Sequence, residues 1–398
     1  MTQSQAQATT RSTVLPFEVV WSGLLGSYRI TLRLLLALHG AMLFACSLPG
    51  AALAADILPR LLLELAMLPM VAFYACFPAA AASAVRRAYA DLDNVPPVLA
   101  AATIRALWSG PGASVIIRSL TKLKPRSRGP EVVAVEAQLA AAASDRVLPV
   151  LVVAQGDAVE VAAAVAALAA GETVAYRLVI HLHGGGFVAM SPADHADYLK
   201  TWARAPGMER TLFISLDYPL APEAPFPLAL NDAFALYAIA ASCSTAPISV
   251  VGDSAGGNLA AALGLLVAAA RGRARGEPEA DAALMLELGP TASVLRDYTA
   301  FAGELPAIDA LVLIYPSLVR ARQRAGLMGA ALALDPLLPA ELNPLIHTAY
   351  VPTTLRAVSA THPLISPLAA PAWLLASADM ASRKYVVCGE CDPLLDDS

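Results

Sequence analysis

Charged side chains are scarce in this sequence. Asp, Glu, Lys and Arg make up 15% of the 398 residues, whereas apolar residues make up 57%. This composition is more apolar and less charged than that of a typical soluble domain. The formal net charge is −5, so nothing in the composition suggests a basic surface that binds nucleic acid. We therefore expect no nucleic-acid partner.

Cysteine is also rare. The five cysteines are scattered and odd in number, which does not predict a disulfide framework. Cys388 and Cys391 form a C-G-E-C sequence directly before Asp392. A redox pair of this kind belongs at a helix start, and a zinc site would need a second pair. We therefore expect neither a metal site nor a cofactor.

Two long runs without formal charge stand in the first quarter of the chain, at 34–55 and 65–85. Each is about as long as a helix that crosses a hydrocarbon core, and arginines flank the pair on both outer sides. Two alternatives stay open: a signal peptide cleaved after the Ala-Leu-Ala sequence at 52–54, or two buried core helices. We predict a membrane anchor over residues 1–90. The protein is then expected at a membrane, and at the endoplasmic reticulum if its source is eukaryotic.

The pattern of the chain changes near residue 130. Residues 91–130 hold clusters of Pro, Gly and charge, which are typical of a linker. Beyond them, short β-branched runs such as 176–182 and 248–253 alternate with helical stretches. This alternation predicts parallel strands joined by helices on both faces of a sheet. We predict an α/β catalytic domain over 131–398.

Two stretches break this alternation. Residues 159–170 are rich in alanine and low in complexity, which predicts a helix or a surface insertion. Residues 271–308 separate a predicted helix from the next strand by more than the usual distance. Their charges predict a solvated insertion.

The sequence VVGDSAGGN places Ser254 between a predicted strand and a predicted helix. Gly252, Asp253, Ser254, Ala255 and Gly256 fit the pattern G-x-S-x-G, in which a tight strand-to-helix turn exposes a strained serine. Small residues on both sides let the strand and the helix approach, and the helix N-terminus favours negative charge on the serine oxygen. The alternative is an ordinary glycine-rich turn with a capping serine.

A second glycine-rich sequence, HGGGF, begins at His183 and lies 71 residues before Ser254. In acyl transfer, backbone N–H groups stabilise the charge that develops on the carbonyl oxygen. An HGGG-type loop and the residue after the nucleophile supply such groups. Because glycines lack a Cβ, this backbone can approach the substrate. The chain has no P-loop pattern, so we predict an oxyanion hole. Its predicted residues are Gly184, Gly185, Gly186 and Ala255.

On these two motifs and three further sequences, the chain resembles the hormone-sensitive-lipase-like branch of the α/β-hydrolases. That group includes arylacetamide deacetylases, steryl acetyl hydrolases and many bacterial esterases. The further sequences are DYPLAPEAPFP at 217–227, SPL at 366–368 and DPLLDD at 392–397. The resemblance covers about residues 145–398. It implies an α/β-hydrolase fold, with a mostly parallel central sheet and helices on both faces.

The resemblance also implies a function. Ser254 would be the nucleophile of a carboxylic-ester hydrolase, Asp392 the acid of its triad, and the substrate a small lipophilic ester with an acetyl or short acyl group. Where the family usually has DYRLAPE, this chain has Pro219 in place of the arginine, and we expect a structural role there. Asp217 and Glu223 in the same stretch are expected to order loops rather than to react.

The histidine of the triad is missing from its expected place. In this fold the chain order is Ser, Asp, His, but all six histidines precede Asp392. We expect that the sequence is truncated and lacks its base together with the last strand and helix. His362 is a less favoured substitute, because a base must lie within hydrogen-bond reach. His183 is expected to order its own loop, and His181 to be a structural residue of a core strand.

Two other hypotheses remain open. The chain could be a non-catalytic member of the same fold that binds a ligand in its pocket, as plant gibberellin receptors do; these receptors resemble this family and lack the histidine. It could also be an inactive fragment, whose exposed sheet edge would tend to aggregate.

Overall fold

The computed structural model describes residues 97–98, 101, 104–105, 130–140, 146–277, 279–288, 293–301, 303–319, 342–389, 392 and 394. All of them lie in one compact unit, Asp93–Ser398. The apolar runs at 34–55 and 65–85 lie outside the described residues. The membrane anchor and the domain boundaries at 90 and 130 therefore stay predictions.

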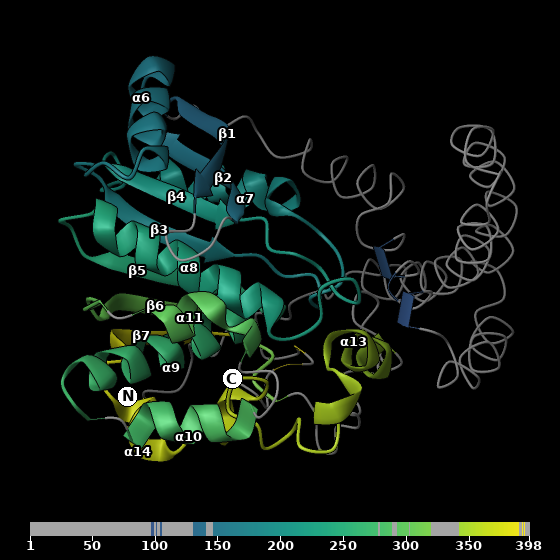
Figure 1. Ribbon diagram of the computed structural model, residues 1–398. Helices are drawn as coiled ribbons and strands as arrows, with labels where there is room; N and C mark the ends of the chain where they lie inside the picture. Colours follow the sequence, from purple (N-terminus) through teal and green to yellow (C-terminus); the bar gives the residue numbers. More distant parts are fainter. Residues whose placement is uncertain are drawn as a thin grey trace, which may run out of the picture. The chain divides into compact units, whose positions relative to one another are not determined.

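A seven-stranded sheet forms the centre of this unit, in the order β1-β2-β4-β3-β5-β6-β7 (Figure 1). From β4 to β7 all neighbouring strands pair in parallel, whereas β1 pairs with β2 and β2 with β4 in antiparallel fashion. The predicted mostly parallel sheet is confirmed. The strands are β1 (Val132–Ala140), β2 (Val147–Gln155), β3 (Arg177–Leu182), β4 (Thr211–Leu216), β5 (Ile248–Asp253), β6 (Ile308–Ile314) and β7 (Ala381–Val387).

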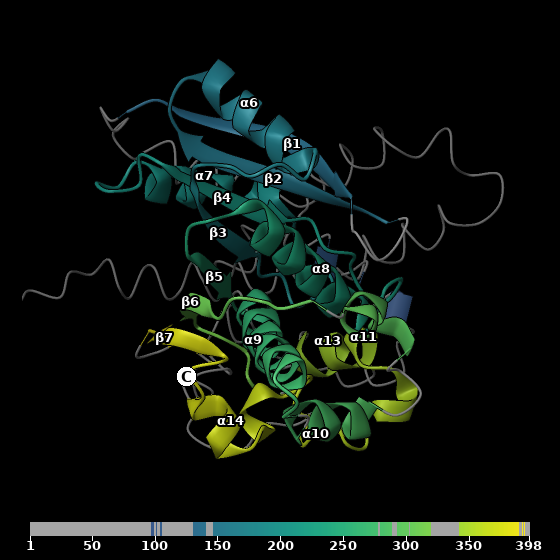
Figure 2. The ribbon, with the colours of Figure 1, turned by 60° about the vertical axis from the view of Figure 1, so that its left-hand side comes forward.

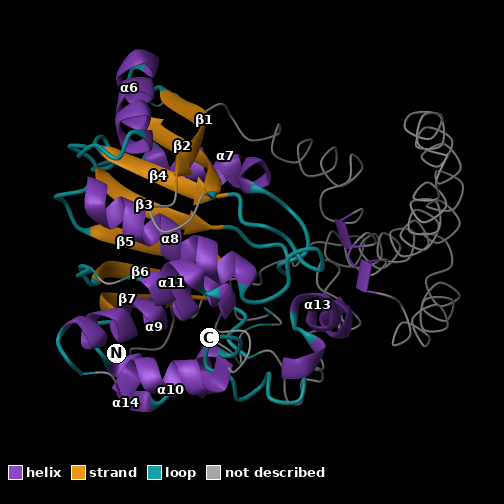
Figure 3. Ribbon diagram, viewed as in Figure 1, coloured by secondary structure: helices purple, strands orange, loops and turns teal. Residues whose placement is uncertain are grey.

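Helices connect the strands and flank the sheet (Figure 3). They are α6 (Ala158–Ala169), α7 (Pro192–Ala203), α8 (Leu228–Cys243), α9 (Ala255–Ala274), α10 (Glu279–Leu288), α11 (Arg296–Ala300), α13 (Leu342–Tyr350) and α14 (Ala372–Ala376). Two short 3-10 turns, η3 (Thr353–Leu355) and η4 (Pro367–Ala369), lie between α13 and α14.

The two faces of the sheet are covered by different helices (Figure 2). α7 connects β3 to β4 and α8 connects β4 to β5, so the two connections run in opposite directions across the sheet. Because crossovers between parallel strands are right-handed, α7 lies on one face and α8 on the other. The connection from β5 to β6 through α9 crosses the sheet in the same direction as the connection through α8, and α9 contacts α8. α9 therefore lies on the same face as α8. The prediction of helices on both faces is confirmed.

α9 is the central helix of the unit. It is long and apolar enough to cross a membrane, but 94% of its most apolar stretch is buried inside the unit. Small residues allow this burial: a Cβ at Gly264 would lie 2.9 Å from Cγ of Met380. α9 therefore packs as a core helix.

The structure differs from the sequence prediction in three places. β1 was not predicted, although its sequence VVAVEAQLA is largely apolar; it is an edge strand in which only Leu139 is fully buried. β2 is antiparallel to both of its neighbours, although the alternating pattern favoured parallel strands. The predicted insertion at 271–308 is largely helical, with the end of α9 followed by α10 and α11.

One buried hydrogen-bond pair ties α11 to α8. Asn231 Nδ2 donates to Asp297 Oδ2, and the backbone N–H of Asp297 donates to Asn231 Oδ1 at 3.0 Å. Both side chains are buried. Removing the amide would leave a buried carboxylate with one donor fewer.

We expect Asn231→Ala to lower the free energy of unfolding by about 1–3 kcal/mol, because a buried polar group then loses its partner. Urea unfolding followed by circular dichroism measures this change. Thr299→Ala, at an exposed position of α11, is the control and should change the value by less than about 0.5 kcal/mol. Equal stability of Asn231→Ala and the wild type would contradict the prediction.

Candidate active site

Ser254 lies in the tight turn between β5 and α9, with a left-handed backbone (φ 53°). Its backbone N–H donates to the carbonyl of Ile314 at 2.9 Å. A Cβ at Gly252 would overlap the carbonyl of Gly256, and a Cβ at Gly256 would overlap the carbonyl of Leu182. Only glycine permits such approaches. The G-x-S-x-G residues therefore let β5, α9 and the end of β3 meet at the serine.

The oxyanion loop, residues 183–190, follows β3. Gly185 and Gly186 have left-handed backbones, and so do Phe187 (φ 65°) and Met190 (φ 69°). A residue other than glycine is strained in this region and keeps the conformation only where its surroundings hold it. A Cβ at Gly184 would overlap the carboxylate of Asp253. The loop thus lies directly against the turn that carries the serine.

Ala255 is buried and opens α9. The first N–H groups of a helix have no partner within the helix. The same end of the helix carries the positive pole of its dipole. The structure therefore brings together the predicted nucleophile, the glycine loop and the predicted second donor.

His183 orders its own loop. Its Nδ1 donates to the carbonyl of Gly184 at 2.7 Å, and its ring stacks on Tyr218 with 4.1 Å between centroids. The hydroxyl of Tyr218 donates to the carbonyl of His183 at 2.6 Å. Burial, together with the nearby His195, lowers the pKa of His183 to about 3. The ring is therefore neutral near pH 7.

A buried polar cluster lies beneath the loop and is called the Asp253 cluster below. It consists of Asp253, His181, His195, Tyr198 and Tyr315. His181 Nε2 lies 3.4 Å from Asp253 Oδ1, and His195 Nε2 lies 3.5 Å from Oδ2. The hydroxyl of Tyr198 donates to Oδ1 at 2.9 Å, and that of Tyr315 to Oδ2 at 3.5 Å. One carboxylate thus joins β3, α7, β5 and the end of β6.

The charges of the Asp253 cluster follow from these contacts. Burial alone would raise the pKa of Asp253, but the hydrogen bonds and charges of the two histidines outweigh it and hold that pKa well below its usual range. Burial alone would lower the pKa of His195, and the bond and charge of Asp253 raise it instead. Burial lowers the pKa of His181. These shifts favour an ionised Asp253, a charge on His195 and a neutral His181.

His181 behaves as the sequence predicted for a core-strand histidine: Nδ1 lies 2.7 Å from Oγ of Ser215 on the neighbouring strand β4. Sequence reasoning gave no role to His195. His195 and Tyr198 are three residues apart on α7, a spacing that places both on one helix face. That spacing predicts a shared helix face, but it gives no sign of the contact with Asp253.

Asp392 lies beyond the end of β7. Its backbone N–H donates to the carbonyl of Gly389 at 3.0 Å, and its Oδ1 accepts from the N–H of Leu394 at 2.8 Å. β5 and β7 flank β6 in parallel, so Asp392 and Ser254 follow strand ends at the same edge of the sheet. Burial and the charges of Asp253 and Asp392 raise the pKa of Tyr315.

The SPL sequence is tied to α9 by Asn258. Its Nδ2 donates to the carbonyl of Ser317 at 2.7 Å and to that of Ile365 at 2.8 Å. His362, which shortly precedes the SPL sequence, is fully buried, and its Nδ1 accepts from the N–H of Leu364 at 3.2 Å. Nε2 of His347 lies 2.8 Å from Oγ of Ser359.

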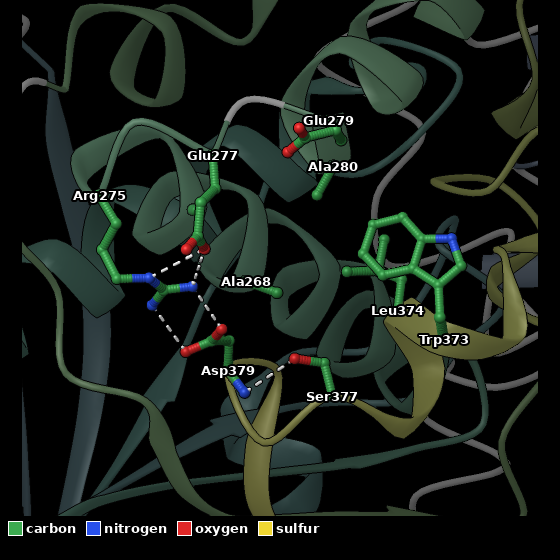
Figure 4. A pocket seen from close by; sticks show the side chains of 10 residues that line it. Ala268, Arg275, Glu277, Glu279, Ala280, Trp373, Leu374, Ser377 and Asp379 are labelled. Atoms are coloured by element: carbon green, nitrogen blue, oxygen red, sulfur yellow. Dashed lines mark hydrogen bonds and ion pairs between the residues drawn. The ribbon is translucent and has the colours of Figure 1, made fainter.

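A cavity of about 500 Å³ lies at the C-terminal end of α9 (Figure 4). Arg275 lies on one side of it and pairs with Glu277 at 2.9 Å and with Asp379 at 2.7 Å. With Glu279, the lining holds one basic and three acidic side chains. α9 has 20 residues, which span about 30 Å. Because Ser254 lies at the other end of α9, this cavity is separate from the candidate active site. Within the part of the chain that the structure describes, no group of three His, Cys, Asp or Glu side chains could hold a metal ion.

Comparison with protein families gives a match over residues 179–398, to the family described as alpha/beta hydrolase fold. Hormone-sensitive lipase of Bos taurus is 49% identical over 98 residues, which are 23% of this chain and 13% of the lipase. An esterase of Acinetobacter venetianus is 38% identical over 93 residues, which are 23% of this chain and 30% of the esterase. The matched stretch thus spans less than a third of either relative.

Solved structures show the same fold. An esterase of Pyrobaculum calidifontis superposes with a TM-score of 0.51 and 23% identity, over 78% of this chain and 80% of that one. At this identity the likeness concerns the fold alone.

We expect Asp253→Asn to destabilise the domain more at pH 5.5 than at pH 8. The pKa of His195 is raised, so its stabilisation is fully present below the unfolded value of about 6.5 and is lost as the pH rises through the folded value. The substitution removes the carboxylate that raises this pKa, so the buried ring must give up its proton on folding. Urea unfolding at the two pH values measures the difference.

The matched control is Asp309→Asn, which breaks a surface pair with Arg383. Its effect should be small and nearly equal at the two pH values, because exposed ion pairs contribute little. A loss of stability in Asp253→Asn that does not depend on pH would show that His195 carries no charge in the folded state.

Proposed function

The chain belongs to the family of proteins with the alpha/beta hydrolase fold, and on this basis we propose that it hydrolyses carboxylic esters through an acyl-enzyme on Ser254. One observation carries the proposal: the strained turn at Ser254 and the oxyanion loop are held together by glycines that have no room for a Cβ. A loop that served only as a connection would not need this geometry.

In the proposed reaction, Oγ of Ser254 attacks the ester carbonyl. Negative charge develops on the carbonyl oxygen, and the N–H groups of Gly185, Gly186 and Ala255 stabilise it together with the N-terminus of α9. A general base takes the proton of Oγ and passes it to the alcohol as the ester C–O bond breaks. Water then attacks the acyl-enzyme, which releases the acid and restores Ser254. Asp392 would orient the base, as the acid does in a Ser-His-Asp triad.

The base is the open part of this proposal. The described histidines all have ring partners within the fold: His181 and His195 in the Asp253 cluster, His183 on Gly184, His347 on Ser359 and His362 on Leu364. These contacts favour, as a second candidate, a protein that binds a ligand at the same site without reacting with it. In that case Ser254 would only position the ligand.

We propose a small lipophilic ester with an acetyl or short acyl group as the substrate, and attachment to a membrane, at the endoplasmic reticulum if the source is eukaryotic. Two observations support this. The relatives are named as a lipase and an esterase. The runs at 34–55 and 65–85 are long enough to span a bilayer.

We expect a fluorophosphonate probe to label the wild-type chain and the Ser377→Ala control, but not Ser254→Ala. Hydrolysis of p-nitrophenyl acetate should fall by about 10³-fold or more in Ser254→Ala, because the nucleophile is lost. Ser377 is a suitable control because it lines the separate cavity. An unlabelled wild type that still binds a non-hydrolysable ether analogue would favour the ligand-binding candidate instead.

We expect the full chain to stay with membranes after an alkaline carbonate wash, because spanning helices are held by buried apolar area. A variant that begins at residue 91 should be released by the same wash. Sedimentation followed by immunoblotting compares the two. Release of the full chain would rule out a membrane-spanning anchor.

A further inference from the structure

Arg105 joins two loops of the candidate active site. Its Nε donates to the carbonyl of Val188 in the oxyanion loop at 2.6 Å, and its Nη2 donates to the carbonyl of Ala221 at 2.8 Å. Its two Nη atoms also donate to the carboxylate of Glu223, at 2.8 and 2.6 Å. One guanidinium therefore bridges the oxyanion loop and the DYPLAPE loop.

The loop that Arg105 contacts needs outside support. Phe187 and Met190, on either side of Val188 and Ala189, have left-handed backbones, and such strained residues persist only where neighbours hold them. The N–H of Ala221 donates to the carbonyl of Phe187 at 2.8 Å. The carbonyl groups of Phe187 and Val188 are thus both held, the first by the DYPLAPE loop and the second by Arg105.

Arg105 itself is held in place by its own segment. Ala101 and Ile104 are fully buried, whereas Val98 is exposed. A spacing of three and four residues puts the partly exposed Arg105 on the same helical face as the buried positions 101 and 104. This segment was predicted as part of a linker, and its Arg105 bonds to loops of the domain.

The geometry requires an arginine. A guanidinium is planar and presents donors in several fixed directions, so it can bond two carbonyl groups and a carboxylate at once, which an ammonium group does less well. The ion pair alone contributes little, because the side chains of Arg105 and Glu223 are 32% and 58% exposed. The bonds to the two backbone carbonyls are therefore the part that fixes the loops.

We propose that Arg105 is a positioning residue of the oxyanion hole, which locks residues 185–190 in their strained conformation. This proposal rests on the ester hydrolysis proposed above. Arg105 does not touch the reacting atoms; it acts through the backbone that carries the N–H donors. The segment before the catalytic domain thereby becomes part of the active site.

Hydrogen exchange tests this without any need for activity. In Arg105→Lys and Arg105→Ala, we expect the N–H groups of Val188 and Ala189, which bond to the carbonyl of Gly185, to exchange about tenfold faster or more. Exchange in β5 should stay unchanged. Glu223→Gln should have a smaller effect, because both carbonyl bonds of Arg105 remain.

The matched control is Arg210→Ala. Arg210 also bonds a backbone carbonyl, that of Ala175, and lies 3.6 Å from the carboxylate of Glu160. It precedes β4 and lies at the opposite edge of the sheet from Ser254. Exchange in the oxyanion loop and hydrolysis of p-nitrophenyl acetate should both be unchanged in this variant.

Steady-state hydrolysis of p-nitrophenyl acetate provides the second measurement. We expect kcat to fall about tenfold or more in Arg105→Lys while KM changes less than about twofold, because a displaced oxyanion hole weakens binding of the transition state alone. A raised KM with unchanged kcat, or faster exchange throughout the domain, would overturn the proposal in favour of a purely structural role.

The two proposals can fail separately. If the wild type hydrolyses no ester, the proposed function fails. The exchange experiment still decides the role of Arg105 in that case. Faster exchange confined to residues 185–190 in the Arg105 variants supports the positioning role, and unchanged exchange refutes it.

Discussion

The candidate site depends on one backbone contact, between the turn after β5 and the end of β3. At Gly256 the helix backbone meets the carbonyl of Leu182 so closely that no Cβ would fit. This contact fixes the distance between Ser254 and the oxyanion loop, because the loop begins at the next residue of the chain. The pairing of β3 with β5 then sets the geometry of the whole site.

The carboxylate of Asp253 also stabilises the contact between the turn after β5 and the end of β3. The carboxylate of Asp253 lies where a side chain at Gly184 would be, and it is bonded by groups from α7 and from the end of β6. A buried carboxylate is costly unless it is paired and hydrogen-bonded. Here the same bonds that satisfy the carboxylate also join the elements around the serine, so the charge helps to specify one arrangement of the site.

Most of the sheet and the motif residues could be predicted from the sequence, because their signals are local. β3 and β5 are short, mainly apolar runs next to glycines, and buried strands of a parallel sheet have this pattern. α9 is a long apolar run that begins within the G-x-S-x-G motif. His195 and Arg105 could not be predicted in this way. Their partners lie 58 and 83 residues away along the chain, at Asp253 and Val188, and no spacing in the sequence indicates that they meet. β1 was missed although its sequence is largely apolar, and in the structure it is an edge strand with only Leu139 fully buried.

The two halves of the candidate triad differ in how firmly they are held. Ser254 follows β5, whose residues are nearly all buried, and it is fixed by glycines and by the Asp253 cluster. Asp392 follows β7, in which Tyr385, Val386 and Val387 are 50%, 47% and 56% exposed. A triad works only when its acid and its nucleophile are held in register. Burial fixes the nucleophile and the oxyanion loop, whereas Asp392 lies beyond an exposed strand and bonds to its near neighbours Gly389 and Leu394. The geometry of the acid therefore depends more than that of the serine on whatever packs against β7.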